Sequence, residues 1–445
     1  MSEGTFYIKV YGCQMNVYDG DRLRAAMNGM GWSEAEEIDG ADFAIFVTCS
    51  IRDKAEQKVI SELGRFRQQW ESNKRPAFAV VGCMAQRTGE GLTRRFPWVR
   101  VVAGPRSLGA VPEAIAASRK GGGAVLLLDE SPTELTDLAC VPETRENAHK
   151  AYITISHGCD QFCSYCIVPY VRGRFGSRAP GSVLEEARRL VARGAGEITL
   201  IGQNVNSYGA DFARDPKLSG YRFARLLADV SEIEGLKRLR FTTSHPVDFT
   251  DDILDVMASG KNVCPSINLP VQSGSDKVLR EMNRKYRRDE YLAAIGRIRA
   301  ALPDVGLTTD LIVGFPGESE EEFGESVSLL ERVRFDLVHT AAYSPRDGTP
   351  AAARSDQVPK RDRARRLAAV NAIQARISAG INAPLVGETF EVLLDEAAPK
   401  GEGLLQGRTV SDKVVLVSAP AGMTGTLRSV RITGSSAWCL EGELI

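Results

Sequence analysis

Three cysteines stand close together in the stretch SHGCDQFCSYCIVPYVRGRFGSR, residues 156–178. Cys159, Cys163 and Cys166 have the spacing C-x3-C-x2-C, which lets one tight loop direct three thiolates at a single object. Iron–sulfur clusters are held by such thiolates. Three protein ligands leave one iron of a cluster open, where a small molecule can bind and react. The spacing therefore predicts a cluster site with one open iron.

A zinc site is the main alternative for the same three cysteines. A structural zinc site normally closes four ligands, usually as two close pairs. The only fourth candidate nearby is His157, two residues before Cys159. On spacing alone, a zinc knuckle or a chance group of cysteines therefore stays open.

Length, charge and cysteine usage limit the class of protein. The 445 residues suggest about three domains. A net charge of -1 argues against an overall polyanion binder, so any nucleic-acid contact must come from local patches. No apolar segment follows a basic start, and no run approaches ~18 apolar residues. Nine cysteines, an odd number, favour thiolate chemistry over disulfides, so we expect a cytoplasmic protein.

The first part of the chain alternates short β-branched or aromatic runs with helix-like stretches, which predicts a Rossmann-like parallel α/β domain. The runs are residues 5–10, 42–47 and 76–81. Just past each run comes a cysteine: Cys13, Cys49 and Cys83. Ligands in open α/β sheets gather at the carboxyl ends of strands, so we expect a second cluster with these three protein ligands.

Buried core cysteines are the alternative to this second cluster, because free cysteine is among the most buried residue types. The placement of all three at strand ends, in phase with the βα repeat, favours the cluster. Cys140, Cys264 and Cys439 lack such placement, and we expect them to be ordinary structural cysteines.

The next domain, after a connection over residues 121–144 with a short strand at 124–128, repeats the βα pattern six times. Its strands are predicted at 152–156, 197–201, 239–241, 266–269, 306–312 and 337–342, with helices such as 183–193, 291–302 and 320–333. Six repeats fit an incomplete (β/α)6 TIM-type barrel, whose active site should lie at the carboxyl ends of the strands.

Unusual polar residues fall at those predicted strand ends. They are Gly202-Gln203-Asn204, Thr243-Ser244-His245, Gln272-Ser273, Asp310, Gly314 and Tyr343-Ser344. Singly, each is as easily a loop residue that satisfies backbone groups. Their recurrence favours a binding site, for which we select Gln203, Asn204, Ser244, Gln272 and Asp310.

Two basic clusters offer candidate phosphate contacts, although such runs are often solvated faces. They are Arg280, Arg284, Lys285, Arg287 and Arg288, and then Lys360, Arg361, Arg363, Arg365 and Arg366.

The last segment, from about residue 383, is predicted to be a small β-barrel of oligonucleotide-binding type. Its expected strands are residues 389–394, 413–417, 424–432 and 437–440. The segment is net acidic, so RNA binding here would depend on Lys400, Arg408, Lys413, Arg428 and Arg431.

With these motifs in place, nearly the whole chain resembles the radical S-adenosylmethionine (SAM) methylthiotransferases. The resemblance rests on YGCQMN, GCDQFCSYCIVPYVRGR, LIGQNVNSYG, RFTTSHPVDF, LPVQSGS, MNRKY, TDLIVGFPGE and YSPRDGTPAA. It implies a methylthiotransferase domain over 1–120, a linker over 121–144, a radical SAM core over 145–378 and a TRAM domain over 379–445. The motifs are most similar to the branch that acts on isopentenyl adenosine in tRNA.

That resemblance implies two 4Fe–4S clusters, a catalytic one on Cys159, Cys163 and Cys166 and an auxiliary one on Cys13, Cys49 and Cys83. SAM would serve both as methyl donor and as source of a 5'-deoxyadenosyl radical. The product would be a methylthio group on carbon 2 of the adenosine beside the anticodon. An electron donor such as flavodoxin or ferredoxin and a monomeric state are also implied.

Two places depart from the family pattern. Asp19 is followed by Gly20 where the family has serine, and Gly104-Pro105-Arg106 replaces a turn rich in glycine and threonine. Sister enzymes that modify a ribosomal-protein aspartate or threonylcarbamoyl adenosine in tRNA remain alternatives. So does a non-catalytic RNA-binding protein that holds iron–sulfur clusters or zinc.

Overall fold

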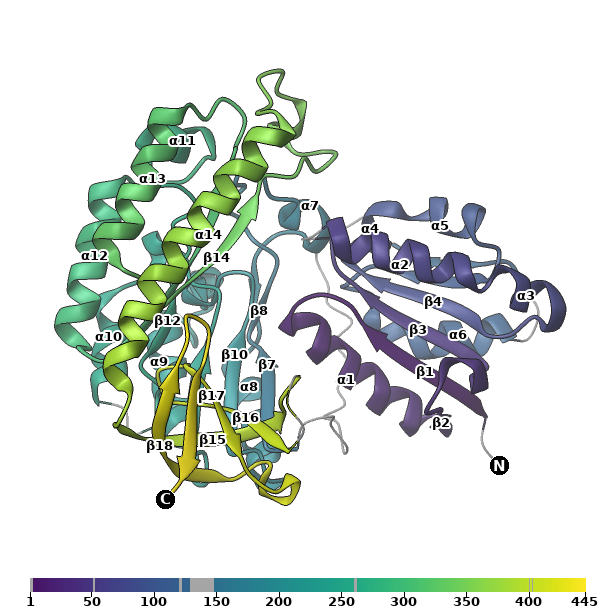
Figure 1. Ribbon diagram of the computed structural model, residues 1–445. Helices are drawn as coiled ribbons and strands as arrows, with labels where there is room; N and C mark the ends of the chain where they lie inside the picture. Colours follow the sequence, from purple (N-terminus) through teal and green to yellow (C-terminus); the bar gives the residue numbers. More distant parts are fainter. Residues whose placement is uncertain are drawn as a thin grey trace. The chain divides into compact units, whose positions relative to one another are not determined.

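A six-stranded parallel sheet forms the N-terminal part of the chain (Figure 1). In order across the sheet, the strands are β2 (Trp32–Glu34), β1 (Gly4–Val10), β3 (Phe43–Thr48), β4 (Ala77–Gly82), β5 (Val99–Ala103) and β6 (Val125–Leu127). The three strands predicted from the βα pattern are confirmed. The pattern missed β2 and β5, and the short strand expected in the linker is β6, the edge of this sheet.

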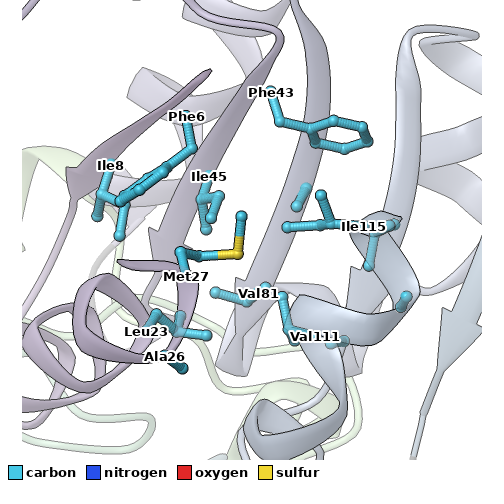
Figure 2. Packing of buried hydrophobic residues seen from close by; sticks show 14 of the residues in the cluster. Phe6, Ile8, Leu23, Ala26, Met27, Phe43, Ile45, Val81, Val111 and Ile115 are labelled. Atoms are coloured by element: carbon cyan, nitrogen blue, oxygen red, sulfur yellow. The ribbon is translucent and has the colours of Figure 1, made fainter. Parts of the chain in front are cut away.

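Helices cover both faces of this sheet. Successive side chains of a strand point to opposite faces, so Ile45 packs toward α1 (Gln14–Gly29) and α6 (Val111–Arg119), as Figure 2 shows. Phe46 packs on the other face, toward α2 (Asp53–Arg65), α4 (Cys83–Thr88) and α5 (Glu90–Arg95). Burial on both faces explains why β3 and β4 are apolar throughout.

The computed structural model describes residues 3–50, 53–119, 122–128, 148–259, 262–399, 401 and 403–445. Cys140, Lys400 and most of the predicted linker lie outside them. The chain divides into two units. The first comprises Met1–Asn147, Tyr152–Asp160 and Ile167–Gly176, and the second comprises Ala148–Ala151, Gln161–Cys166 and Ser177–Ile445.

Six parallel strands form an incomplete barrel, here called the core barrel, which lies in the second unit apart from residues 152–154 of its first strand. Its strands are β7 (Lys150–Thr154), β10 (Glu197–Ile201), β11 (Arg238–Phe241), β12 (Ser266–Asn268), β13 (Gly306–Val313) and β14 (Leu337–Ala342). They form the sheets β11-β10-β7 and β12-β13-β14, and a parallel bridge joins Leu239 of β11 to Val263, which precedes β12. The six predicted strands and the fold class are confirmed.

Helices and short strands fill the connections. They are α3 (Arg67–Asn73), β8 (Ser156–His157), α7 (Val168–Arg172), β9 (Gly176–Ser177), α8 (Pro180–Ala192), α9 (Phe223–Ser231), α10 (Asp251–Ser259), α11 (Asp276–Glu281), α12 (Arg288–Ala301), α13 (Glu320–Val333) and α14 (Lys360–Asn382). No helix within the described ranges is long and apolar enough to cross a membrane.

The C-terminal segment is a closed five-stranded barrel, here called the C-terminal barrel, as predicted. In barrel order, the strands are β15 (Thr389–Ala397), β16 (Leu404–Arg408), β17 (Val414–Ser418), β19 (Leu440–Leu444) and β18 (Leu427–Ser435). The sequence pattern missed β16. The strand expected at 437–440 was misplaced, because Ser436 and Cys439 close a turn there and β19 begins at Leu440.

Buried arginines join the C-terminal barrel to the core barrel. Arg238 donates to the carbonyl oxygen of Arg408 at 2.7 Å, and Arg240 donates to that of Thr409 at 2.7 Å. Both arginines come from β11 and are more than nine-tenths buried. Lys413 of the C-terminal barrel likewise reaches Asp336, which directly precedes β14, at 2.6 Å. The C-terminal barrel therefore packs near the amino ends of these strands, opposite the predicted active site.

Candidate functional site

The first cysteine trio lies at one edge of the N-terminal sheet. Cys13 directly precedes α1, Cys49 follows β3, and Cys83 is the first residue of α4. Strands β1, β3 and β4 are neighbours in that order and run parallel, with Val47 paired to both Val10 and Val81. Because parallel strands end at the same edge, the structure gathers all three cysteines as expected from their positions.

Two glycines make the close approach of these segments possible. Gly12 has φ +124°, and a Cβ there would lie 2.4 Å from Cβ of Cys49. Gly82 has φ +100°, and a Cβ there would lie 2.4 Å from the carbonyl oxygen of Thr48. Only glycine adopts such backbone angles without strain and leaves this space empty. Each glycine directly precedes a cysteine of the trio.

We therefore expect Gly82→Ala to disturb the trio without touching a cysteine. The strained backbone and the clash with Thr48 should destabilise the first unit by about 1–3 kcal/mol and lower the iron content of the purified protein. Thermal unfolding and iron analysis measure both effects. Gly64→Ala is the matched control, because Gly64 lies in α2 with open space around its Cα. Equal iron content in both variants would contradict this expectation.

Asn16 ties the trio to the strand ends. It is fully buried, its Oδ1 lies 3.2 Å from Sγ of Cys13, and its Nδ2 donates to the carbonyl oxygen of Thr48 at 2.9 Å. Thr48 in turn donates from its hydroxyl to the carbonyl oxygen of Val81 at 2.7 Å. These bonds fix the ends of β3 and β4 relative to the start of α1.

A buried cation accompanies the three sulfurs. A hydrogen bond with Cys49 lowers the pKa of Cys13 to about 5, against burial and with help from the positive charge of Arg172. Burial raises the pKa of Cys83, and Arg172 opposes that effect. Nε of Arg172 lies 3.1 Å from Sγ of Cys83. The guanidinium therefore lies where the negative charge of bound thiolates would collect.

Among the residues that the structure describes, no three His, Cys, Asp or Glu side chains are arranged to hold a single metal ion. In an iron–sulfur cluster, each cysteine binds its own iron, so the sulfurs stand farther apart than ligands of one ion. Three cysteines at one sheet edge with a cation beside them fit such a cluster.

The departures from the family pattern have structural counterparts. Gly20 packs α1 against β1, and a Cβ there would lie 2.7 Å from Cγ2 of Val10. Valine at position 10 therefore leaves no room for a larger residue at position 20. Arg106 is buried, and its Nη2 lies 3.3 Å from Nε2 of His157. His157 was the candidate fourth ligand for zinc, and its Nε2 already contacts Arg106.

The second trio lies on the loop between β8 and α7. The backbone N–H of Cys159 donates to the carbonyl oxygen of Gly173 at 3.2 Å. Gly158 has φ +66°, and a Cβ there would lie 2.0 Å from the carbonyl oxygen of Arg174, so the entry to the loop requires glycine. Along this loop, Cys159 belongs to the first unit, whereas Cys163 and Cys166 belong to the second.

A clamp from the MNRKY segment holds the second half of this loop. The backbone N–H of Ser164 donates to the carbonyl oxygen of Met282 at 3.0 Å. The Ser164 hydroxyl donates to the carbonyl oxygen of Glu281 at 2.8 Å. Asn283 donates to the carbonyl oxygen of Phe162 at 2.9 Å. Phe162 itself has φ +47°, a strained value for a bulky residue, as is common where surrounding structure fixes a functional loop.

Arg284 of the same segment contacts a cysteine of the trio. Its guanidinium is buried, and Nη1 lies 3.6 Å from Sγ of Cys163. Sequence reasoning placed Arg284 in a basic cluster for phosphate contact, which its burial contradicts. The same holds for Arg366, which is buried in an ion pair with Glu318 at 2.7 Å. A charge run in the sequence does not distinguish a buried ion pair from an exposed cation.

The cations considered for RNA binding in the C-terminal barrel are mostly paired. Lys413 bonds Asp336, Arg408 pairs with Asp412 at 3.1 Å, and Arg431 pairs with Glu443. Arg428 is exposed.

Residues expected to surround SAM or the adenosine lie at or near the carboxyl ends of core-barrel strands. Gln203 and Asn204 follow β10, Ser244 follows β11, Gln272 follows β12, and Asp310 lies within β13. Oδ1 of Asn204 and Oγ of Ser244 are buried without a hydrogen-bond partner in the structure. Buried polar atoms normally have partners, so these two fit a bound polar ligand.

Asp248, which the sequence analysis did not select, contacts one of the candidate site residues. Its Oδ2 accepts from Nδ2 of Asn204 at 2.6 Å, from the hydroxyl of Ser207 at 2.8 Å and from Nε2 of Gln161 at 3.2 Å. The carboxylate therefore engages the amide nitrogen of Asn204 and leaves its oxygen for a ligand that donates. The motif RFTTSHPVDF contains Asp248, but nothing local marks its role.

The other selected residues are held by the barrel. Asp310 accepts from Nδ2 of Asn268 at 3.2 Å, and the Gln272 backbone N–H donates to the carbonyl oxygen of Asp310 at 2.8 Å. Gln272 and Thr243 have φ +68° and +71°, so strained backbone recurs at the strand ends. Burial and the charge of Arg284 lower the pKa of His245 to about 3, which keeps this neighbour of Ser244 neutral.

A cavity of about 520 Å³ lies elsewhere, between α8 and α9, and the strand-end residues do not line it.

Two family models match the chain. The model of the Radical SAM superfamily matches residues 153–330, which include the loop with Cys159, Cys163 and Cys166. The model of the Uncharacterized protein family UPF0004 matches residues 5–104, which include the first trio. Each trio therefore falls inside one matched region.

Solved structures share the fold. One is the radical S-adenosylmethionine methyltransferase TsrM from Kitasatospora setae, with cobalamin and a 4Fe–4S cluster bound. The likeness has a TM-score of 0.54 at 15% identity and covers 91% of this chain and 77% of that one. At this identity, it concerns the fold alone.

Curated relatives match over the full length. A tRNA-2-methylthio-N(6)-dimethylallyladenosine synthase of Carboxydothermus hydrogenoformans is 41% identical, with 100% of both chains covered. A protein of the same name from Clostridium botulinum (strain Okra / Type B1) is 41% identical over 99% of this chain and 97% of the relative. One from Mycobacterium avium is 42% identical over 97% of this chain and 58% of the relative. The chain belongs to the radical SAM family of tRNA-2-methylthio-N6-dimethylallyladenosine synthases.

Proposed function

We propose that this protein adds a methylthio group to carbon 2 of N6-isopentenyl adenosine beside the anticodon of tRNA. The observation that carries the proposal is the 41% identity over the whole chain to a relative named for that product. The target carbon carries only hydrogen, with neither a leaving group nor useful acidity. General acid–base or nucleophilic catalysis by side chains therefore cannot activate this carbon.

In this proposal, each cysteine trio holds one 4Fe–4S cluster. The catalytic cluster is held by Cys159, Cys163 and Cys166, and the auxiliary cluster by Cys13, Cys49 and Cys83. When bound, the clusters and SAM supply the radical, the methyl group and the site for sulfur, which side chains lack.

The chain itself supplies position. We propose that Asn204 and Ser244 bind SAM or the adenosine through their buried oxygens, with Gln203, Gln272 and Asp310 beside them. Asp248 supports Asn204, because its carboxylate accepts from the amide nitrogen and keeps the amide oxygen turned toward the ligand. An acceptor fixed in this way favours ligand groups that donate hydrogen bonds, such as amino and hydroxyl groups.

The remaining parts of the proposal concern organisation and partners. The domain boundaries are 120/121, 144/145 and 378/379, with the last segment a TRAM domain. The protein works as a monomer in the cytoplasm, where its tRNA substrate is found, and receives electrons from a donor such as flavodoxin or ferredoxin.

An anaerobic reaction of the reconstituted protein with isopentenylated tRNA tests the substrate. Mass spectrometry of the digested tRNA should find a methylthio group on the isopentenyl adenosine. The matched control is the same tRNA without the isopentenyl group, which should stay unmodified. Modification only of a ribosomal-protein peptide or of threonylcarbamoyl adenosine would replace the proposal by the corresponding sister activity. No modification of any of these, despite loaded clusters, would favour the non-catalytic alternative.

A further inference from the structure

Each cysteine trio has one sulfur in contact with a deeply buried arginine. In the first trio, Arg172 is 7% exposed, and its Nε donates to Sγ of Cys83 at 3.1 Å. Its Nη2 also lies 3.5 Å from Oδ2 of Asp19. Arg172 ends α7, and Val171 of that helix packs against Cys83.

In the second trio, Arg284 is 8% exposed and contacts Sγ of Cys163 at 3.6 Å. The rest of its guanidinium is fixed, because Nε donates to the Tyr286 hydroxyl at 3.0 Å and Nη2 donates to the carbonyl oxygen of Pro270 at 2.9 Å. Within the described part of the chain, no carboxylate lies within ion-pairing distance of Arg284.

A buried arginine stays charged, and an uncompensated buried charge is costly. Tyrosine and carbonyl oxygens offer Arg284 hydrogen bonds but no negative charge. A thiolate at Cys163, as in a bound cluster, would provide that charge. Arg172 already has Asp19, so its contact with Cys83 is shared between two anions. The two sites therefore have the same kind of contact with different surroundings.

We propose that Arg172 and Arg284 are positioning residues that set the reduction potentials of the auxiliary and catalytic clusters independently, each through one cysteine sulfur. The proposal rests on the cluster assignment in the proposed function, but not on the tRNA substrate. Reduction adds one electron, and thus negative charge, to a cluster. Hydrogen bonds to the sulfurs and a nearby cation stabilise that added charge. Removing either arginine should therefore make its own cluster harder to reduce.

The test is an anaerobic redox titration of reconstituted full-length protein without tRNA, followed by electron paramagnetic resonance. Each cluster is measured alone, in a background where the other trio is replaced by alanine. Arg284→Met should lower the equilibrium constant for reducing the catalytic cluster at least about tenfold, which is 59 mV for one electron. Arg172→Met should do the same to the auxiliary cluster. Each substitution should leave the other cluster's potential unchanged.

Asp19→Asn should shift the reduction potential of the auxiliary cluster in the direction opposite to that of Arg172→Met. It removes the anion that competes with Cys83 for Arg172, so the auxiliary cluster should become easier to reduce while the catalytic cluster is unaffected. General loss of packing would not produce opposite shifts at one cluster. If Arg172→Met loads no iron, the potential of the auxiliary cluster is measured instead in Asp19→Asn and in Arg172→Lys, which keeps the positive charge.

Unchanged potentials in all loaded variants, or equal shifts of both clusters, would overturn the proposal. So would a shift of Asp19→Asn in the same direction as Arg172→Met. Failure of a trio background to hold its expected cluster would instead count against the cluster assignment itself. The two failures are therefore distinguishable.

Discussion

Replacing Cys159, Cys163 and Cys166 together by alanine is expected to abolish SAM cleavage while the auxiliary cluster stays bound. The first trio takes its shape from the ends of β1, β3 and β4 and from two glycines, all within the first 83 residues. Arg172 and Val171 of α7, which follows the loop of the second trio, also contact Cys83, but the substitution keeps these residues. Iron content should fall to about half, because one of two four-iron clusters is lost, and 5'-deoxyadenosine should become undetectable.

Cys264→Ala and Cys439→Ala are the matched controls for this experiment. Cys264 is buried beside Arg240 in the core barrel, and Cys439 closes a turn with Ser436, so neither belongs to a trio. Both controls should retain full iron and SAM cleavage. Loss of all iron in the triple variant would show that the two trios are not independent sites.

Deletion of the chain from Ala383 onward is expected to damage the core barrel as well as any tRNA contact. The deletion removes the carbonyl groups that accept from Arg238 and Arg240 and exposes to water the face of the core barrel that the C-terminal barrel covers. The lost hydrogen bonds and packing reduce a total stability of only about 5–15 kcal/mol. SAM cleavage without tRNA should therefore fall together with the unfolding temperature.

Because the deletion also removes support from the core barrel, it cannot by itself measure RNA contact by the C-terminal barrel. Arg428→Ala gives a cleaner test of RNA contact, because Arg428 is exposed and the substitution keeps the C-terminal barrel intact. It should lower tRNA affinity and leave the unfolding temperature unchanged. A truncated protein with unaltered unfolding and SAM cleavage would contradict the role of Arg238 and Arg240.

Local patterns in the sequence predicted the elements and the cysteine positions well. Cys13, Cys49 and Cys83 each follow a β-rich run, and the rule that parallel strands end together brings such residues to one edge. The strands β2 and β16 were missed for local reasons. Strand β2 has only three residues, and β16 includes Gly407, which weakens a strand pattern.

Long-range polar contacts were beyond the sequence. Arg172 and Cys83 are 89 residues apart, and Arg284 and Cys163 are 121 apart. No local signal links such pairs, and Arg284 stands in a charge run that equally suggests an exposed surface. Asp248 reaches Asn204 across 44 residues. The supports of the candidate site therefore became visible only in three dimensions.

The fate of SAM during methylthiolation tests the central claim most directly. In the anaerobic reaction with isopentenylated tRNA, one SAM should donate a methyl group and another should be cleaved reductively. We expect methylthiolated tRNA, S-adenosylhomocysteine and 5'-deoxyadenosine to appear together, as measured by mass spectrometry of one reaction mixture. Methylthiolated product with 5'-deoxyadenosine but without S-adenosylhomocysteine would contradict the two roles of SAM.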